Sequence, residues 1–154
     1  SEEDILFLHK LFFEQIDSGN AGRYRQKNVI ITGTGYLPPD YQKVPELMRK
    51  YIGNLNRDVK DKHPLEQASD LHAEFESIHP FTDGNGRIGR LLLSIFTIKN
   101  GYCPVIITPI RRAEYITAMQ KSNKGDLNGL RTLVMSVVYE EMKALKRLVE
   151  SLSK

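Results

Sequence analysis

The 154-residue chain predicts an all-α domain, with one small β-hairpin beside a helical bundle. Apolar residues recur at the i, i+3, i+4 spacing of amphipathic helices through most of the chain, which indicates about six or more helices. Residues 91–98 are nearly all apolar and predict a helix in the middle of the core. The clear β signal lies in residues 28–37, where β-branched residues lead into Gly33-Thr34-Gly35.

The first three helices follow from apolar periodicity and from residues that start or stop helices. The pattern in residues 5–16 is amphipathic, and the polar residues 17–20 are expected to end that helix. Residues 44–55 predict a second helix. A third is expected to begin at Pro64, because proline is accepted in a first helical turn, and to deliver His79 at its end.

Three further helices are expected in the second half of the chain. Residues 87–100 predict the central helix, apolar on nearly all sides and stopped by Gly101. Residues 114–123 predict another helix, and residues 130–152 predict a long one. The long helix carries an apolar stripe made of Leu130, Val134, Val137, Met142, Leu145, Val149 and Leu152.

Composition is that of an ordinary soluble globule, with 40% hydrophobic and 27% charged residues, and the length suits one domain. The net charge of +3 is scattered apart from Arg111-Arg112, so no nucleic-acid partner is expected. Cys103 cannot form an internal disulfide and is expected to fill a core position. No membrane partner is expected for this segment, because it has no apolar run of spanning length and no signal-peptide pattern. Localisation stays unknown, with the cytoplasm favoured for the segment as given.

The segment His79-Pro80-Phe81-Thr82-Asp83-Gly84-Asn85-Gly86-Arg87-Ile88-Gly89-Arg90 combines residue types that suit polyphosphate chemistry. Gly84, Asn85 and Gly86 are expected to form a turn whose N–H groups, with the following helix N-terminus, can hold an anion. Asp83 lies immediately before that turn, and its hard carboxylate oxygens could hold a magnesium ion shared with phosphates.

Three other side chains complete this set. Arg87 and Arg90 lie three residues apart on one helix face and can each grip phosphate bidentately. His79 has an imidazole suited to taking a proton from an attacking hydroxyl. Each residue alone is more often merely solvated, but together they indicate transfer from a nucleotide phosphate to a hydroxyl.

Residues 79–90 resemble the signature of the Fic family: His-Pro-Phe, an acidic residue, Gly-Asn-Gly-Arg and a second arginine. The likeness extends to residues 21–25, 28–39, 63–64 and 101–107, so it covers essentially the whole chain. The resemblance implies that residues 1–154 are a Fic catalytic core, which could be excised from a longer chain.

The resemblance implies a protein AMP transferase that uses ATP with Mg²⁺, or Mn²⁺, and modifies a Tyr, Ser or Thr hydroxyl of a target protein. His79 would be the base and Asp83 the metal ligand. The amides of Gly84, Asn85 and Gly86 would form the anion hole, with the Asn85 side chain on the α-phosphate. The arginines would bind the outer phosphates, Arg87 the leaving group and Arg90 the γ-phosphate.

The resemblance also implies contacts outside the motif. The predicted hairpin would be a flap that docks the target by main-chain pairing, formed by Ile30, Ile31, Thr32, Gly33, Thr34 and Gly35. A purely structural edge hairpin is the alternative. Tyr115 and Asn123 match family positions beside adenine, although a tyrosine at helical spacing can equally be a core residue. His72 is interpreted as a packed, hydrogen-bonded histidine, because its spacing from His79 is not that of a zinc motif.

Regulation and reaction direction stay open. In relatives, an inhibitory helix of Ser or Thr, three free positions, Glu and then Gly or Asn places its glutamate on the second motif arginine. Residues 136–140 come near this pattern, but Glu141 follows, and we interpret the match as accidental. The segment as given is therefore expected to be uninhibited unless an upstream inhibitory helix or a separate antitoxin-like protein supplies the glutamate, and a homodimer is compatible with the sequence. Removal of AMP, transfer of another nucleotide or of phosphocholine, and an inactive binding module are the alternative functions; the intact His79 and Asp83 argue against the last.

Overall fold

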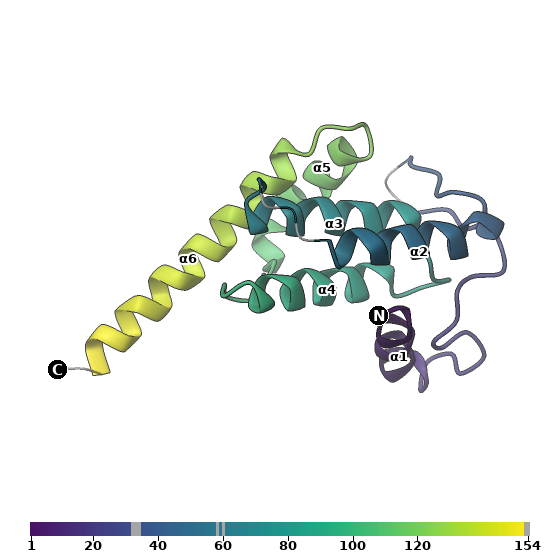
Figure 1. Ribbon diagram of the computed structural model, residues 1–154, viewed down its shortest axis with the longest axis horizontal. Coiled ribbons are helices and arrows are strands. Elements are labelled where there is room, and N and C mark those ends of the chain that lie inside the picture. The colour runs from purple at the N-terminus through teal and green to yellow at the C-terminus, as the bar shows by residue number, and fades with distance from the viewer. Residues whose placement is uncertain (32–34, 58, 60, 153–154) are drawn as a thin grey trace.

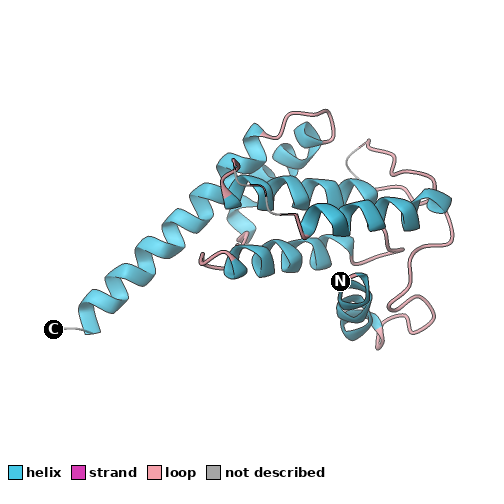
Figure 2. Cartoon of the chain, viewed as in Figure 1, coloured by secondary structure: helices cyan, strands magenta, loops and turns pink. Residues whose placement is uncertain are grey.

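The computed structural model describes residues 1–31, 35–57, 59 and 61–152. All regular structure in these ranges is helical, and none of their residues lies in a β-strand (Figure 2). The α-helices are α1 (Glu2–Phe13), α2 (Val44–Leu55), α3 (Pro64–Ile78), α4 (Asn85–Lys99), α5 (Arg112–Ser122) and α6 (Asn128–Leu152). Short 3₁₀ turns, η1 (Tyr41–Lys43) and η2 (Pro109–Arg111), precede α2 and α5. The all-α prediction is confirmed.

Helix α3 is the centre of the bundle, because α2, α4 and α6 all pack against it (Figure 1). α1 packs at one end of the bundle, against α2 and α4, while α6 begins beside α3 and α5 and then runs out from the body. No helix in the described ranges is both long and apolar enough to cross a bilayer.

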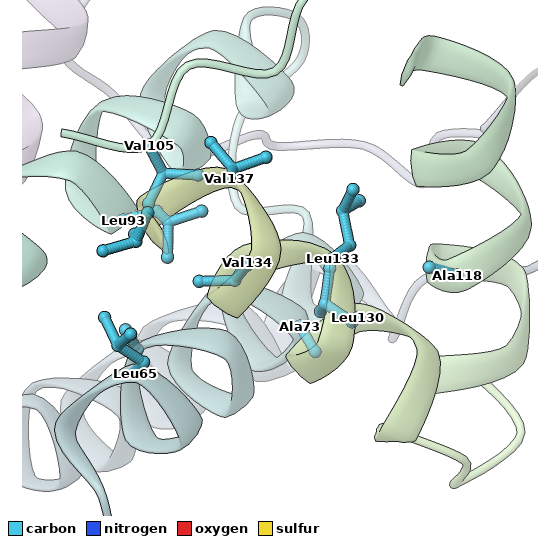
Figure 3. Packing of buried hydrophobic residues seen from close by; sticks show 11 residues of the cluster. Leu65, Ala73, Leu93, Val105, Ala118, Leu130, Leu133, Val134 and Val137 are labelled. Atoms are coloured by element: carbon cyan, nitrogen blue, oxygen red, sulfur yellow. The ribbon is translucent and has the colours of Figure 1, made fainter. Parts of the chain in front are cut away.

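Apolar burial forms two adjoining clusters. The first joins the start of α6 to α3, α4 and α5, and Figure 3 shows its buried residues Leu65, Ala73, Leu93, Val105, Ala118, Leu130, Leu133, Val134 and Val137. The second joins α1, α2, α3 and α4 around Phe75, Phe81 and Ile88, which are each 0% exposed. A fully buried side chain of this size contributes about 1.5–3 kcal/mol, so α3 is held from both sides.

The helices α2 and α3 begin where the sequence predicted. α3 begins at Pro64, with the His63 ring accepting a hydrogen bond from Leu65 N at 3.2 Å. α2 spans Val44–Leu55 as predicted. α1 ends at Phe13, earlier than expected, and Ile16 lies in the following turns with 62% of its surface exposed. The Asp17 side chain bonds Asn20 there and stabilises a turn rather than another helical residue.

Two helices are less buried than their sequences suggested. α4 was expected to be covered on nearly all sides, yet Ile95 and Ile98 are 38% and 54% exposed, because α3 and α1 cover only part of its surface. The stripe on α6 is buried only in its first half. Beyond Val138 the helix leaves the body, so its later apolar residues are exposed: Met142, Leu145, Leu148, Val149 and Leu152.

The predicted hairpin is not seen as strands in the described residues. Residues 28–31 and 35–40 have no regular secondary structure, and Thr32, Gly33 and Thr34 lie outside the described residues. Asn28 braces this segment: its Oδ1 accepts a hydrogen bond from Tyr41 N at 2.9 Å, and its Nδ2 donates to Asp40 at 3.2 Å. Side-chain hydrogen bonds therefore hold the two ends of the segment together.

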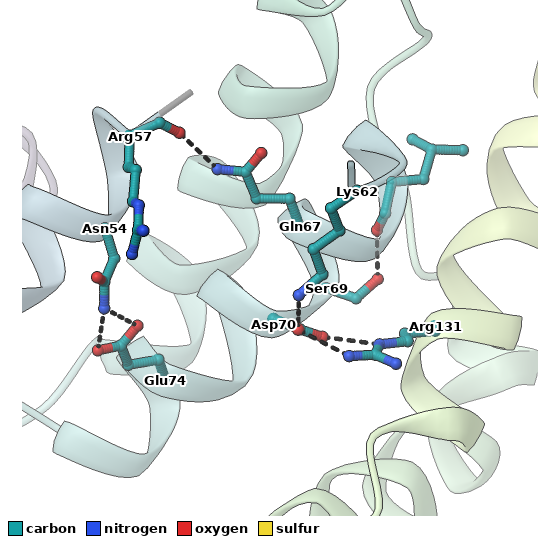
Figure 4. Close-up of polar contacts among 9 residues, drawn as sticks. Asn54, Arg57, Lys62, Gln67, Ser69, Asp70, Glu74 and Arg131 are labelled. Atoms are coloured by element: carbon teal, nitrogen blue, oxygen red, sulfur yellow. Dashed lines mark hydrogen bonds and ion pairs between the residues drawn. The ribbon is translucent and has the colours of Figure 1, made fainter. Parts of the chain in front are cut away.

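An ion-pair network joins α3 to α6 and to the loop before α3 (Figure 4). Arg131 on α6 donates two hydrogen bonds of 2.8 Å to Asp70 on α3, and Lys62 also pairs with that carboxylate. Burial works to raise the pKa of Asp70, but the hydrogen bonds from Arg131 and Lys62 outweigh it, so the pKa lies below the ordinary 3.8.

The variant Asp70→Asn should lower the free energy of unfolding at pH 7 by about 1–2 kcal/mol, because it removes the charge that both cations share. The native-state pKa of Asp70 is lowered, so its contribution is present above pH 3.8 and is lost as the pH falls through the native value. Urea unfolding should therefore show a larger difference between the two proteins at pH 7 than near pH 3. Glu46→Gln, at an exposed position, is the control; an equal loss in both variants would contradict the prediction.

Candidate active site

Helix α3 ends at Ile78, so His79 is the first residue of the motif loop, residues 79–84. His79 adopts a left-handed backbone conformation with φ 52°, and no other non-glycine residue of the described ranges has a positive φ. Non-glycine residues rarely adopt this conformation unless surrounding contacts enforce it. The backbone of the loop is therefore turned sharply at the proposed base.

Buried Arg25 enforces that turn. Its side chain is 1% exposed, and its Nε donates a hydrogen bond of 2.8 Å to the His79 carbonyl oxygen. Its Nη1 and Nη2 donate to the carbonyl oxygens of Lys27 and Pro39, and its own backbone N–H bonds Pro80 O at 2.9 Å. One guanidinium thus ties the segment before α2 to the start of the motif loop.

The His79 ring is oriented for proton abstraction. Its Nδ1 lies 3.2 Å from the Glu76 carbonyl oxygen, which can only accept, so Nδ1 carries the proton and Nε2 is left as the acceptor. Burial is the main cause that lowers the pKa of His79 below its ordinary value. The ring is therefore neutral at pH 7, the form that a general base requires.

His9 on α1 holds the other end of the loop. Gly22 N donates to its Nδ1 at 2.9 Å, so Nε2 carries the ring proton and donates to the Asp83 carbonyl oxygen at 3.1 Å. The ring is also stacked between Phe13 and Phe81, with centroid distances of 4.7 and 3.8 Å. His9 fixes the backbone next to the proposed metal ligand, although the sequence showed it only as one residue on a helix face.

Of the three residues expected in the glycine turn, only Gly84 precedes α4, which already begins at Asn85. Gly84 has φ 81°, and a Cβ at this position would lie 2.2 Å from Cε2 of Phe13, so no other residue fits. Asn85 and Gly86, which were expected in the turn, form the first helical turn instead. Their N–H groups belong to the end of α4 that helical bonding leaves free, where the helix dipole attracts anions.

The Asn85 side chain does not face the open side of the loop. It is 2% exposed, and its carboxamide makes two hydrogen bonds of 2.8 Å with the backbone N–H and carbonyl of Phe81. In this structure the side chain braces the loop, and its contact with an α-phosphate stays a prediction. The backbone amide of Asn85 is a further candidate anion ligand.

Asp83 and Arg87 are exposed, whereas Arg90 is half-buried. One Asp83 carboxylate oxygen accepts a hydrogen bond from Gly84 N at 2.6 Å, and the other lies 3.7 Å from Arg87. The Arg87 guanidinium also lies over the Phe13 ring at 4.6 Å. An exposed ion pair of this kind contributes little to stability, so both groups can exchange their contact for a ligand.

One cavity of about 340 Å³ brings the predicted catalytic and phosphate-binding residues together. It lies between the motif loop, the first turn of α4 and the segment before α2. Its lining residues are Ile30, Ile31, His79, Thr82, Asp83, Gly84, Asn85, Gly86, Arg87 and Arg90. Two residues of the predicted flap therefore share a cavity with the predicted catalytic, metal-binding and phosphate-binding residues.

The predicted nucleoside residues lie in two different places. Tyr115 and Arg90 together line a second hollow, beside η2 and α5, so Arg90 borders both cavities. The Tyr115 hydroxyl bonds His72 Nε2 at 2.8 Å, and His72 is buried and hydrogen-bonded as predicted. Asn123 lines a separate hollow with Gly35 of the expected flap.

The sequence did not indicate that three further residues contribute to this site: His9, Arg25 and Glu76. The first two hold loop carbonyl oxygens that are far away along the chain, and no local pattern announces such contacts. Glu76 lies under the first turn of α4, and its position three residues before His79 could have drawn attention to it.

A family model described as the Fic/DOC family matches residues 1–97. Curated relatives named protein adenylyltransferase Fic, from Drosophila mojavensis and Culex quinquefasciatus, are 34% identical over 126 residues, which is 81% of this chain. The chain spans about a quarter of the length of these relatives, 25% in both cases.

Solved structures show the same arrangement of helices. A Fic-1 fragment from C. elegans has a TM-score of 0.87 at 31% identity, covering 98% of this chain and 44% of that one. A Fic family protein from Desulfovibrio desulfuricans G20 has a TM-score of 0.78 at 28% identity, covering 94% and 47%.

Gly84→Ala should lower the free energy of unfolding by about 2–4 kcal/mol, the cost of a left-handed alanine plus a clash with Phe13. Gly125→Ala is the matched control, because Gly125 has φ 91° with no atom within 4 Å of the added Cβ, and should cost only about 1–2 kcal/mol. Urea unfolding measures both losses. Equal losses at the two positions would show that the Phe13 contact does not constrain the loop.

Proposed function

Since this chain belongs to the Fic/DOC family, we propose that residues 1–154 are the catalytic core of a protein adenylyltransferase. The proposed reaction transfers AMP from ATP to a Tyr, Ser or Thr hydroxyl of a target protein and releases pyrophosphate. The single cavity that joins a neutral histidine, an exposed carboxylate, free helix N–H groups and two arginines carries this proposal. The names of the curated relatives support it.

The reaction needs little more than positioning and charge stabilisation. The target oxygen attacks the α-phosphorus while His79 Nε2 takes its proton, and the bond between the α-phosphorus and the bridging oxygen breaks. Pyrophosphate leaves with that oxygen. The free N–H groups of Asn85 and Gly86 lie where they can stabilise the charge that grows on the α-phosphate oxygens.

The two arginines suit the outer phosphates. Arg87 is exposed, and its contacts are a 3.7 Å ion pair with Asp83 and the face of the Phe13 ring, so it can turn to the leaving pyrophosphate. Arg90 comes one turn later on α4 and is assigned the γ-phosphate. Both remain charged at any working pH, which lets them neutralise the leaving group.

Asp83 fits a magnesium ion. Its side chain is 73% exposed, opens onto the cavity and supplies hard carboxylate oxygens, one of them held in place by Gly84 N. No group of three or more His, Cys, Asp or Glu side chains suited to a metal occurs in the described ranges, so a metal at Asp83 would take its other ligands from phosphates and water. When bound, magnesium or manganese would neutralise phosphate charge and orient the leaving group.

The segment before α2 is proposed to dock the target. Ile30 is 76% exposed, and Ile31 lines the cavity beside His79. An extended target backbone at this lip would bring its hydroxyl to the histidine, with pairing to residues 30–35 fixing its register. Regulation by an inhibitory helix or protein also remains a proposal; Glu140, in the nearest internal match, is exposed on α6 and makes no ion pair with Arg90 in the described structure.

His79→Ala should reduce transfer of labelled adenylate by at least about 100-fold, the usual contribution of a general base, while ATP affinity changes little. The measurement uses α-labelled ATP and a cell lysate as the source of targets. Because the pKa of His79 is lowered, wild-type activity should already be on its plateau at pH 7 and fall only at lower pH.

Parallel incubations with labelled GTP, UTP and a choline-bearing nucleotide test the alternatives. A label from one of these alone would assign another nucleotide, and release of AMP from modified proteins would assign the reverse reaction. No label and no nucleotide binding under any condition would contradict the proposed function.

Asp83→Ala should abolish the dependence of the rate on magnesium and slow transfer by a factor of about 100 or more. ATP binding without metal should stay unchanged, because the arginines and helix N–H groups remain. Titration of the transfer rate against magnesium measures the effect, with Asp126→Ala, outside the cavity, as the control. A variant that keeps the metal dependence of the wild type would remove Asp83 from the metal site.

A further inference from the structure

Glu76 on α3 is a carboxylate that the proposed reaction does not use. The residue is only partly buried as a whole, but its Oε1 is fully buried and has no hydrogen-bond partner. A buried carboxylate oxygen without a partner is costly, so it calls for a physical explanation.

Two glycines of the motif make room for this carboxylate. A Cβ at Gly89 would lie 2.3 Å from Glu76 Oε1, and a Cβ at Gly86 would lie 3.9 Å from it. Glu76 therefore reaches under the first turn of α4, into space that only the absence of side chains leaves open. Its charge is placed directly behind the phosphate-binding face.

Arg90 lies near the same position on α4. Its Nη1 is 3.2 Å from the Cβ position of Gly86, and Glu76 Oε1 is 3.9 Å from that position, so the two charged groups are near neighbours. The two groups nevertheless form no ion pair, and Arg90 interacts with the Tyr115 hydroxyl. A modest rotation of either side chain would bring the opposite charges together.

The titratable groups around Glu76 differ in the pH at which they change charge. Burial raises the pKa of Glu76 to about 7, and Arg90, the cation that faces it from α4, offsets part of that rise. Burial lowers the pKa of His72 on α3 to about 4, so this ring is neutral. Burial also raises the pKa values of Tyr115 on α5 and Tyr51 on α2, so both stay protonated. Within this cluster, Glu76 is the group that titrates near neutrality.

We propose that Glu76 competes with the outer phosphate of the nucleotide for Arg90 and thereby makes the affinity for ATP, but not for ADP, depend on pH. The proposal rests on the proposed function, in which Arg90 binds the γ-phosphate. Carboxylate and phosphate both prefer the guanidinium fork, and two anions beside one cation repel each other. The ionised carboxylate therefore opposes ATP, and the protonated acid leaves Arg90 to the phosphate.

The sign of the pH effect follows from linkage. A bound γ-phosphate raises the pKa of Glu76 further, so ATP binding takes up a proton. ATP affinity is then highest below the pKa of the free protein and falls as the pH rises through the pKa of the complex. ADP leaves the Arg90 end of the site empty and should show little of this dependence.

The test compares wild type with Glu76→Gln, which keeps the shape and removes the charge. Calorimetric titration with Mg-ATP and Mg-ADP at pH 6 and pH 8 should show about tenfold tighter ATP binding by the variant at pH 8, the equivalent of one pKa unit. At pH 6 the two proteins should bind ATP alike, and ADP affinity should match within about twofold throughout. Titrations in buffers of different ionisation enthalpy should show proton uptake on ATP binding only in the wild type.

Glu74→Gln is the matched control, because Glu74 lies on the same helix but bonds Asn54 away from the cavity. Glu76→Met, neutral and of similar length, should reproduce the Glu76→Gln result, and thermal melting checks that both fold. If ATP and ADP affinities fall together, or the pH dependence of ATP binding survives in both neutral variants, the competition is refuted while nucleotide binding stands. If no protein binds either nucleotide, both this inference and the proposed function fail.

Discussion

The rest of the molecule depends on the packing of the end of α3 against the start of α4. The loop between them is short and reverses direction through two left-handed residues, His79 and Gly84. Contacts from outside the loop help to hold both turns. Arg25 bonds the carbonyl of His79, His9 bonds the carbonyl of Asp83, and Asn85 clasps the backbone of Phe81. Rigid supports from three parts of the chain thus set the geometry of the exposed reactive groups, as an electrostatically preorganised site requires.

The parts of the fold that sequence could predict were those decided by neighbours along the chain. Pro64 and the periodicity after it predicted α3, and the motif predicted which residues would share a cavity. The contacts of His9 and Arg25 could not be predicted, because each joins segments more than fifty residues apart. The bracing role of Asn85 could not be predicted for a related reason. An amide that meets a ligand and an amide that braces a loop look alike in the sequence, and only the folded loop shows that this one bonds the backbone of Phe81.

The apolar periodicity of the sequence also predicted more burial of α6 than the structure shows. The apolar stripe of α6 continues with the same spacing to Leu152, yet only its first half meets other helices of the described chain. A repeat of apolar residues reports that a face can be buried, whereas burial itself depends on another element lying there. The sequence of residues 28–37 predicted strands, but the described part of that segment forms none and is braced by side-chain hydrogen bonds instead. β-Propensity reflects suitability for a half-buried pleated surface rather than a fixed local preference.

Phe13 joins α1 to the motif loop. Its ring occupies the space next to Gly84, stacks on His9 and lies under the Arg87 guanidinium. α1 therefore supports the motif loop from outside the cavity. A displacement of this helix would remove the ring that contacts both Gly84 and Arg87, so the position of α1 and the geometry of the loop are coupled.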